Sequence, residues 1–501
     1  MTGTAASRTA RTAAQLVFPG FRFGQDDPER ALSLVAMGVG GFCLYGGTAR
    51  QVAAFTARLQ ARAAVPLLFC ADYENGAASH CRDATALPSN MGVAASGRLD
   101  LARLKAEITA QEALALGVRW VLAPVVDLAV EPDNPIVNIR SFGADPDLVA
   151  RFAGAYLEGL RRHRVLGCLK HFPGHGRTVR DSHMELPHIR ADRRTLERRD
   201  LAPFRDLLAR ADSVMLGHLA VPALGAGRGP FSLSLAARRL LRERLRFQGL
   251  VATDALDMHA VSKRYPETDA ALRALRAGAD VLLVPKAPER LVDRLPAAIA
   301  GNDLVFVEES LARLRLAKQR AGLGRAGTGL PVPGGVGGSR HERQAQRMAE
   351  ACLAWHGCPS VLKGGKLAYV EPGVAPRDWL GRDFIAELRR AGISVRPVSG
   401  AARPGEALVA GIFLRPRAYC GRISLDPAGR AEVLRLAAQA PRTVVVSFGS
   451  PFILAAFPGH GGLCAFSGNA FAQRAAARAL LGRIPAGGRM PVAVGSAAGS
   501  I

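Results

Sequence analysis

The chain has 501 residues, of which 49% are apolar and 22% are charged, and these values are ordinary for a globular protein of two to four domains. No apolar run approaches the ~20 residues of a membrane helix, so the sequence argues against a membrane span. The 66 basic residues outnumber the 42 acidic ones and give a net charge of +24, which brings contact with anionic polymers into consideration. Because acidic residues are interleaved with the arginines, as in residues 190–210, solvated helix faces are the favoured explanation for the excess of basic residues. No obligate nucleic-acid partner is expected.

The eight cysteines form no C-x-x-C pair, and several lie in apolar runs such as G-G-F-C-L-Y. This pattern favours buried free thiols in a reducing compartment over disulfides or metal ligands. The first residues, M-T-G-T-A-A-S-R-T-A-R, lack the apolar core of a signal peptide. A cytoplasmic location is therefore expected.

Residues 1–14 are predicted to be a disordered lead, and the fold is predicted to begin at residues 15–23. From there short apolar runs alternate with amphipathic helices over about 300 residues, which indicates a parallel sheet with helical crossovers. Helices are expected over residues 48–64, 101–116 and 146–163. Strands are expected at residues 40–45, 66–71, 118–126, 165–169, 213–216, 249–253 and 280–284.

Polar residues follow directly after several of these strands, and they are Asp72, Asp127, Lys170, His171, His218 and Asp254. Such residues meet on the catalytic face of a β/α barrel, whereas an open doubly wound sheet gathers its site at one switch point. The fold class is therefore predicted to be α/β, with residues 15–321 forming a (β/α)8 TIM-like barrel. Seven strands are clear in the sequence, and the eighth has no assigned position.

A Gly/Pro-rich linker is predicted over residues 322–340, where the helical pattern ends in G-L-G-R-A-G-T-G-L-P-V-P-G-G-V-G-G-S. Residues 341–501 are predicted to form a smaller three-layer αβα sandwich, with strands at 367–370, 407–414 and 443–448. Because the polar residues of this half are mainly Arg and Ser, few catalytic clusters are expected there.

Residues 170–187, K-H-F-P-G-H-G-R-T-V-R-D-S-H-M-E-L-P, are predicted to form a polar loop after a buried strand. Asp181 and His183 are near enough in sequence for a carboxylate to orient an imidazole. No phosphate-binding loop or G-x-S-x-G motif is present, and Pro173 and Gly174 exclude a helical zinc pair of His171 with His175, so no cofactor or metal is expected. This set of residues suits glycoside cleavage. It offers a carboxylate nucleophile, a proton donor held by a carboxylate, and polar side chains that can bind sugar hydroxyls.

The motifs K-H-F-P-G-H-G and D-S-H, with N-I-R-S-F-G-A-D-P upstream and G-L-V-A-T-D-A-L-D-M downstream, resemble glycoside hydrolase family 3. Within that family the chain is most similar to the β-N-acetylglucosaminidase branch that recycles peptidoglycan fragments. The resemblance extends to the C-terminal V-V-V-S-F-G-S-P-F and G-R-M-P-V. It implies a retaining exo-β-N-acetylhexosaminidase acting on a carbohydrate substrate such as a peptidoglycan or chitin fragment.

The resemblance also implies roles for individual residues. Asp254 would be the nucleophile, His183 the general acid/base and Asp181 its partner. An imidazole titrates near ~6.5 and can donate and then accept a proton at neutral pH, and a neighbouring carboxylate favours its charged form. Four further residues would hold the sugar hydroxyls, and these are Asp72, Arg140, Lys170 and His171.

Structural roles compete with these catalytic ones. Asp254 could cap the following helix, His218 could support the pocket, and Asp127 is favoured as a buried hydrogen-bonding carboxylate. The chain also departs from the resembled branch, since Asn75 and His80 stand where D-x-E-G-G-R and a further Arg are typical.

Three alternatives follow for the function. A β-glucosidase or broad β-glycosidase would share the fold and mechanism. A phosphorylase would use phosphate as the acceptor, because a histidine does not repel an anion as a carboxylate does. A non-catalytic polyanion-binding protein is favoured only by the charge.

Overall fold

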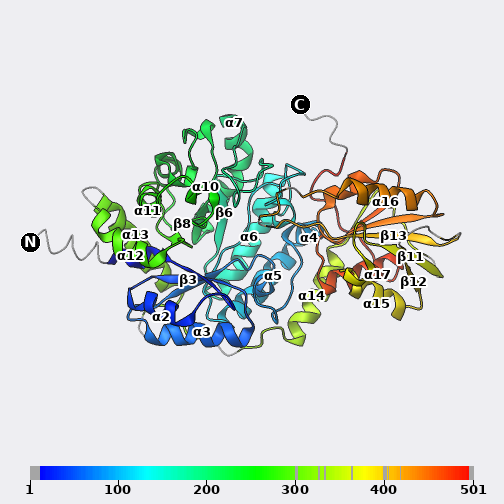
Figure 1. The fold of residues 1–501 in the computed structure, drawn as a ribbon, viewed down its shortest axis with the longest axis horizontal. Helices are drawn as coiled ribbons and strands as arrows, with labels where there is room; N and C mark the ends of the chain where they lie inside the picture. Colours follow the sequence, from blue (N-terminus) through cyan, green and yellow to red (C-terminus); the bar gives the residue numbers. More distant parts are fainter. Residues whose placement is uncertain are drawn as a thin grey trace, which may run out of the picture.

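Eight strand positions close into a barrel, with every neighbouring pair parallel. The computed structural model describes residues 12–299, 303–324, 328–331, 334–362, 365–398, 403, 405–417, 419–421 and 423–495. The barrel forms the larger part of the molecule and a second α/β domain lies beside it (Figure 1). The barrel strands are β1 (Val17–Phe18), β2 (Gly20–Arg22), β3 (Gly41–Tyr45), β4 (Leu68–Ala71), β5 (Trp120–Val121), β6 (Cys168–Phe172), β7 (Ser213–Leu216), β8 (Leu250–Thr253) and β9 (Leu282–Leu283).

The position that the sequence left unassigned lies at the start of the chain. Pro19 has no backbone N–H and divides this strand into β1, which pairs with β9, and β2, which pairs with β3. Single bridges from Trp120 to Leu166 and from Ala252 to Val281 join the remaining neighbours. The ring is thereby closed, as the barrel prediction requires.

Helices cover the outside of this ring because their apolar faces pack on the strands. The predicted helices are confirmed as α3 (Ala49–Arg62), α5 (Leu99–Ala115) and α6 (Pro146–Arg162). Thr48 and Gln51 form a reciprocal capping box at the start of α3. The other longer helices of the barrel are α2 (Pro28–Ala36), α8 (Ala202–Leu207), α11 (Glu267–Arg276), α12 (Pro288–Ala298) and α13 (Asp303–Arg320).

The second domain is a three-layer sandwich around one mixed sheet. Its order is β10-β15-β14-β13-β11-β12, and all pairs are parallel except β10 with β15. One face packs on α14 (Ser339–Ala351), α15 (Arg382–Arg390) and α17 (Ala470–Leu480), and the other packs on α16 (Pro427–Ala437) and on barrel residues around α4 (Asn90–Ala95). The strands are β10 (Ala354–His356), β11 (Lys366–Val370), β12 (Ser394–Pro397), β13 (Ala407–Ile412), β14 (Thr443–Ser447) and β15 (Gly461–Cys464).

Parts of the two segments that the sequence placed outside the domains pack against the barrel. Of the predicted lead, residues 1–11 lie outside the described residues, but Ala13 and Ala14 are buried in a short 3-10 helix against the core, so the fold begins before residue 15. The described part of the predicted linker packs on the barrel, where Gln60 Nε2 donates to the Thr328 carbonyl (2.9 Å) and the Gly337 N–H donates to Glu112 (3.1 Å).

Six cysteines are buried free thiols as predicted, whereas Cys358 and Cys420 are free but exposed. Across the described ranges, no helix has the length and apolarity needed to cross a bilayer.

Candidate active site

A cavity of about 570 Å³ opens at the carboxyl ends of the barrel strands. This is the face where parallel barrel strands deliver the residues that follow them. Of the predicted site residues, Asp181 alone does not line the cavity, and it contacts His183, which does. The others that line it are Asp72, Arg140, Lys170, His171 and Asp254.

Asp254 follows β8 directly, and its own N–H is held by the Leu216 carbonyl of the neighbouring strand (3.0 Å). Burial opposes its ionisation, but His171, His218 and His183 together hold the pKa of the Asp254 carboxyl below its ordinary value. The carboxylate is therefore ionised at neutral pH. It caps no helix, because the next helix, α10 (His259–Ser262), begins after Met258.

His218 supports this position rather than reaching into the cavity. Its Nδ1 lies 2.6 Å from Ser232 Oγ, and its Nε2 lies 3.1 Å from the carbonyl of Ala255. The ring therefore braces the backbone that carries Asp254. This is the structural role that the sequence left open for it.

Asp181 and His183 form a hydrogen-bonded pair on the loop after β6. Asp181 Oδ1 lies 2.7 Å from His183 Nδ1 and accepts the His183 N–H (2.8 Å). Burial opposes ionisation of Asp181, but its bonds with His183 hold the pKa of the carboxyl below its ordinary value. Because Nδ1 is engaged, Nε2 is the ring atom left to exchange a proton in the cavity.

The second domain completes this pair. The backbone N–H of Tyr419 donates to Asp181 Oδ2 at 2.7 Å, and the Tyr419 ring lies 5.0 Å from that of His183. Arg415, Pro416 and Arg417 from the same segment line the cavity. The sequence left open whether this domain only buttresses the barrel, and the structure shows that it reaches the cavity.

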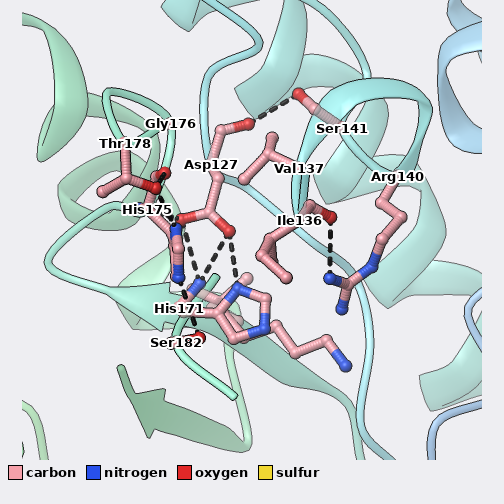
Figure 2. Close-up of polar contacts among 12 residues, drawn as sticks. Asp127, Ile136, Val137, Arg140, Ser141, His171, His175, Gly176, Thr178 and Ser182 are labelled. Atoms are coloured by element: carbon pink, nitrogen blue, oxygen red, sulfur yellow. Dashed lines mark hydrogen bonds and ion pairs between the residues drawn. The ribbon is translucent and has the colours of Figure 1, made fainter. Parts of the chain in front are cut away.

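Asp127 anchors the loop that follows β6 (Figure 2). It is fully buried, accepts the backbone N–H groups of His171 (3.1 Å) and His175 (2.7 Å), and lies 2.6 Å from His171 Nδ1. Burial opposes its ionisation, but His171 lowers the pKa of the Asp127 carboxyl. Asp127 is thus the buried hydrogen-bonding carboxylate that the sequence favoured.

His175 connects this anchor to the acid/base pair. Its Nδ1 lies 2.9 Å from Thr178 Oγ1 and its Nε2 lies 3.1 Å from Ser182 Oγ (Figure 2). Burial lowers the pKa of His175 to about 4, so the ring is neutral at pH 7. Its two nitrogens hold the loop at the residue just before His183. A Cβ on Gly176 would collide with the Leu128 carbonyl, so the loop can lie this close only with glycine there.

Lys170 and Arg140 are held by a carboxylate that sequence reasoning missed. Glu74 accepts Lys170 Nζ (2.6 Å) and the Arg140 guanidinium through both oxygens (2.7 and 2.8 Å), and Asp72 also accepts Lys170 Nζ (2.6 Å). Although burial opposes ionisation, Arg140 and Lys170 hold the pKa of Glu74 well below its ordinary value. Glu74 lies two residues beyond Asp72, past the same strand end, and that position was the available indication.

The loop at residues 75–80, where the chain departs from the resembled branch, makes further polar contacts. Asn75 Oδ1 accepts from Lys105 Nζ (3.1 Å), which also donates to Asn90 Oδ1 (2.6 Å), and Asn90 Nδ2 donates to the Arg140 carbonyl (2.7 Å). Lys105 is fully buried, and burial lowers its pKa to about 7. Asn75 and His80 line the cavity, so the departure from the resembled pattern falls on its wall.

Comparison with known proteins gives a consistent result. A family model described as "Glycosyl hydrolase family 3 N terminal domain" matches residues 12–315. A "Beta-N-acetylglucosaminidase/beta-glucosidase" of Cellulomonas fimi is 32% identical over 403 residues, covering 76% of this chain and 68% of that protein.

Solved structures extend the likeness to both domains. A glycoside hydrolase family 3 β-N-acetylglucosaminidase from Paenibacillus sp. str. FPU-7 superposes with a TM-score of 0.82 at 30% identity, covering 97% of this chain and 99% of that one. A structure titled "Beta-glucoside phosphorylase BglX bound to 2FGlc" shares the fold, with a TM-score of 0.87 at 24% identity over 98% of this chain and 96% of that one.

Proposed function

The chain belongs to glycosyl hydrolase family 3, and from this membership we propose that it is a retaining exo-β-N-acetylhexosaminidase. Its substrate would be a peptidoglycan or chitin fragment with a terminal β-linked N-acetylglucosamine. One observation carries the proposal: an ionised Asp254 and a carboxylate-held His183 border the same cavity. A cytoplasmic location stays a prediction from the sequence.

In the first step the Asp254 carboxylate attacks the anomeric carbon while protonated His183 gives its Nε2 proton to the glycosidic oxygen. The bond to the leaving group breaks, and a glycosyl ester forms on Asp254. In the second step neutral His183 takes a proton from water, whose oxygen attacks the same carbon and releases the Asp254 carboxylate. Two inversions give net retention.

Asp181 has a defined part in this cycle. Its negative charge stabilises the imidazolium form of His183, and its bond to Nδ1 keeps Nε2 as the exchanging atom. The backbone N–H of Tyr419 stabilises the Asp181 carboxylate from the other side. The proton donor is therefore oriented jointly by the barrel loop and the second domain.

The sugar hydroxyls would be held by Asp72, Lys170, Arg140 and His171. Because Glu74 binds both Lys170 and Arg140, the two cations are already oriented before substrate enters. Preorganised polar groups lose less entropy on binding and strengthen their contacts as charge develops.

A broad β-glycosidase is the second candidate, because the name of the Cellulomonas fimi relative includes β-glucosidase activity. The altered Asn75–His80 wall gives this candidate a physical basis, since it changes the groups that face the sugar. Family membership removes the basis for the non-catalytic alternative.

The test compares p-nitrophenyl β-N-acetylglucosaminide with the β-glucoside. Asp254→Asn should lose at least ~10³-fold in kcat/KM on the preferred substrate, because an amide cannot form the ester. Asp257→Asn is the matched control, since that carboxylate lies three residues away and pairs with Arg22 (3.2 Å). Since p-nitrophenolate leaves with little protonation, His183→Ala should mainly slow breakdown of the intermediate.

The outcomes separate the candidates. Rapid release from the acetamido sugar alone would support the hexosaminidase, and comparable release from both sugars would favour the broad β-glycosidase. Equal activity of Asp254→Asn and wild type would contradict the proposed nucleophile.

A further inference from the structure

Three buried free thiols lie inside the barrel at the base of the cavity. They are Cys43 on β3, Cys70 on β4 and Cys168 on β6. Each stands two residues before a residue that lines the cavity, and these residues are Tyr45, Asp72 and Lys170. Because side chains alternate between the two faces of a strand, residues two apart point the same way. The thiols therefore belong to the next layer of the barrel interior, below those residues.

Two of these thiols form a pair. Cys43 and Cys70 are direct partners in the parallel register of β3 and β4, and the Cys70 thiol is hydrogen-bonded to Cys43. Cys43 Sγ also lies 3.2 Å from Tyr45 Oη. Cys43 lines the cavity, whereas Cys70 is fully buried. A small ion in the cavity can therefore reach one sulfur directly and find the second beside it.

The pair is poorly suited to nucleophilic chemistry. Burial, and then its hydrogen bond with Cys43, raises the pKa of the Cys70 thiol well above its ordinary value, so this thiol is protonated at pH 7. A protonated thiol is a poor nucleophile. A metal ion can still bind, because formation of the metal–sulfur bond releases the proton. The pair is therefore better suited to bind a metal ion than to react with an electrophile.

Two sulfur ligands select a particular kind of metal ion. Thiolates favour soft ions such as Cu(I), which can bind two sulfurs in a line. Zn²⁺ takes four ligands in a structural site. Among the described residues, no group of three or more His, Cys, Asp and Glu side chains is placed to hold a metal ion. A two-coordinate soft ion is therefore the kind that this pair can hold.

An ion bound there would disturb the cavity. It would take the sulfur of Cys43 away from Tyr45 Oη, and it would have to separate two hydrogen-bonded sulfurs. Asp72 stands two residues after Cys70 and accepts Lys170 Nζ at 2.6 Å. Because a closely packed interior transmits such a shift to its neighbours, the side chains above the pair would lose their positions for binding a sugar.

We propose that Cys43 and Cys70 form a binding site for one soft metal ion of the Cu(I) class at the base of the cavity, and that the bound ion inhibits the enzyme. Each thiol releases its proton to solvent and each sulfur forms one bond to the ion. No electron is transferred. Binding of the ion is independent of the proposed glycosidase function, whereas inhibition rests on it.

The test uses Ag(I), added as the nitrate in chloride-free buffer, because it shares the preference for two sulfurs and is stable to air. The full chain carries C358S/C420S as a background, which removes the two exposed thiols. In that background C43S/C70S removes the pair, and the matched control Cys464→Ser removes an equally buried thiol of the second domain. Native mass spectrometry counts the bound ions, and p-nitrophenyl glycoside hydrolysis gives the activity of each protein relative to its own metal-free rate.

We expect the background protein to bind one tight Ag(I) ion with the loss of two protons and to lose activity in parallel. The half-inhibitory concentration should rise at least ~100-fold in C43S/C70S, because both ligands are gone, and stay within about twofold in Cys464→Ser. Cys70→Ser alone should weaken binding as well, and it serves if the double variant does not fold. Binding should tighten as pH rises, and excess dithiothreitol should restore activity.

Three results would overturn the inference. A background protein that binds no ion would remove the site, and equally tight binding in C43S/C70S would assign the ion to other ligands. Binding that depends on the pair but leaves hydrolysis unchanged would refute the inhibition. If the metal-free protein cleaves no aryl glycoside, the proposed function fails, while the mass measurement still decides whether the pair holds an ion.

Discussion

Replacing Glu74 with glutamine tests the buried charge network beneath the cavity. Glu74 is 7% exposed and accepts from Lys170, which is 1% exposed, and from Nε and Nη2 of Arg140. The substitution keeps the shape but removes the charge that compensates two cations. Removing one partner of a buried ion pair costs about 3–5 kcal/mol. Since glutamine still offers one carbonyl oxygen, we expect about 3 kcal/mol of lost unfolding free energy at pH 7.

Urea titration of wild type and Glu74→Gln measures this loss. The control is Glu185→Gln, which breaks the exposed pair with Arg180 (3.1 Å) and should cost less than about 1 kcal/mol. Adding Lys170→Met should cost less in the Glu74→Gln background than in wild type, because the uncompensated cation is then removed. A loss no larger than that of the control would refute the proposed importance of the network.

The same network has a defined pH dependence. The folded pKa of Glu74 lies well below its ordinary value, so its contribution to stability is present above the unfolded pKa of ~4.3. That contribution is lost as pH falls through the folded pKa. The difference between wild type and Glu74→Gln should therefore shrink in acid. A difference that grows as pH falls would contradict stabilisation of the Glu74 carboxylate by Lys170 and Arg140.

Two further predictions concern positioning and burial. Asp181→Asn removes the negative charge that stabilises the imidazolium of His183 and should lower kcat about tenfold and alter its pH profile, whereas Tyr419→Phe keeps the N–H that Asp181 accepts and should stay near wild type; an unchanged pH profile in Asp181→Asn would contradict the positioning role. Lys105 has a folded pKa of about 7, below the ordinary ~10.4, so the unfolded chain binds more protons between these values and the Lys105 contribution to stability rises with pH there. Lys105→Met should flatten that rise in urea titrations from pH 7 to 10, while Lys366→Met, at an exposed lysine, should leave it unchanged. Parallel profiles for wild type and Lys105→Met would contradict the lowered pKa of Lys105.

The local sequence was sufficient to predict the barrel and most of the residues around its cavity. Strand and helix periodicity, with polar residues directly after apolar runs, locates Asp72 and Asp254 just past their strands. Lys170 was predicted to follow its strand as well, but it lies inside β6 and still lines the cavity. Since all barrel strands are parallel, those ends meet on one face without any knowledge of distant contacts. The Asp181–His183 pair is equally local, because a single residue separates the two.

The strand at residues 17–22 was harder to assign. Its two pieces are short and divided by Pro19, so their periodicity is weak, and only pairing with β9 and β3 identifies them as one barrel position. Glu74 was missed for a related reason, because its importance comes from Arg140, 66 residues away, and Lys170, rather than from its neighbours in sequence.

Tertiary structure alone decided what the second domain contributes. The stretch after β13 has no catalytic pattern, and its arginines look like the many others in a chain of net charge +24. Packing of the sandwich against the barrel brings Arg415, Arg417 and the Tyr419 N–H to residues more than 200 positions earlier. Sequence therefore determined the barrel and its local pairs, whose geometry follows from strand direction and spacing. The part of the cavity wall that comes from the second domain depends on the contact between two separately patterned domains.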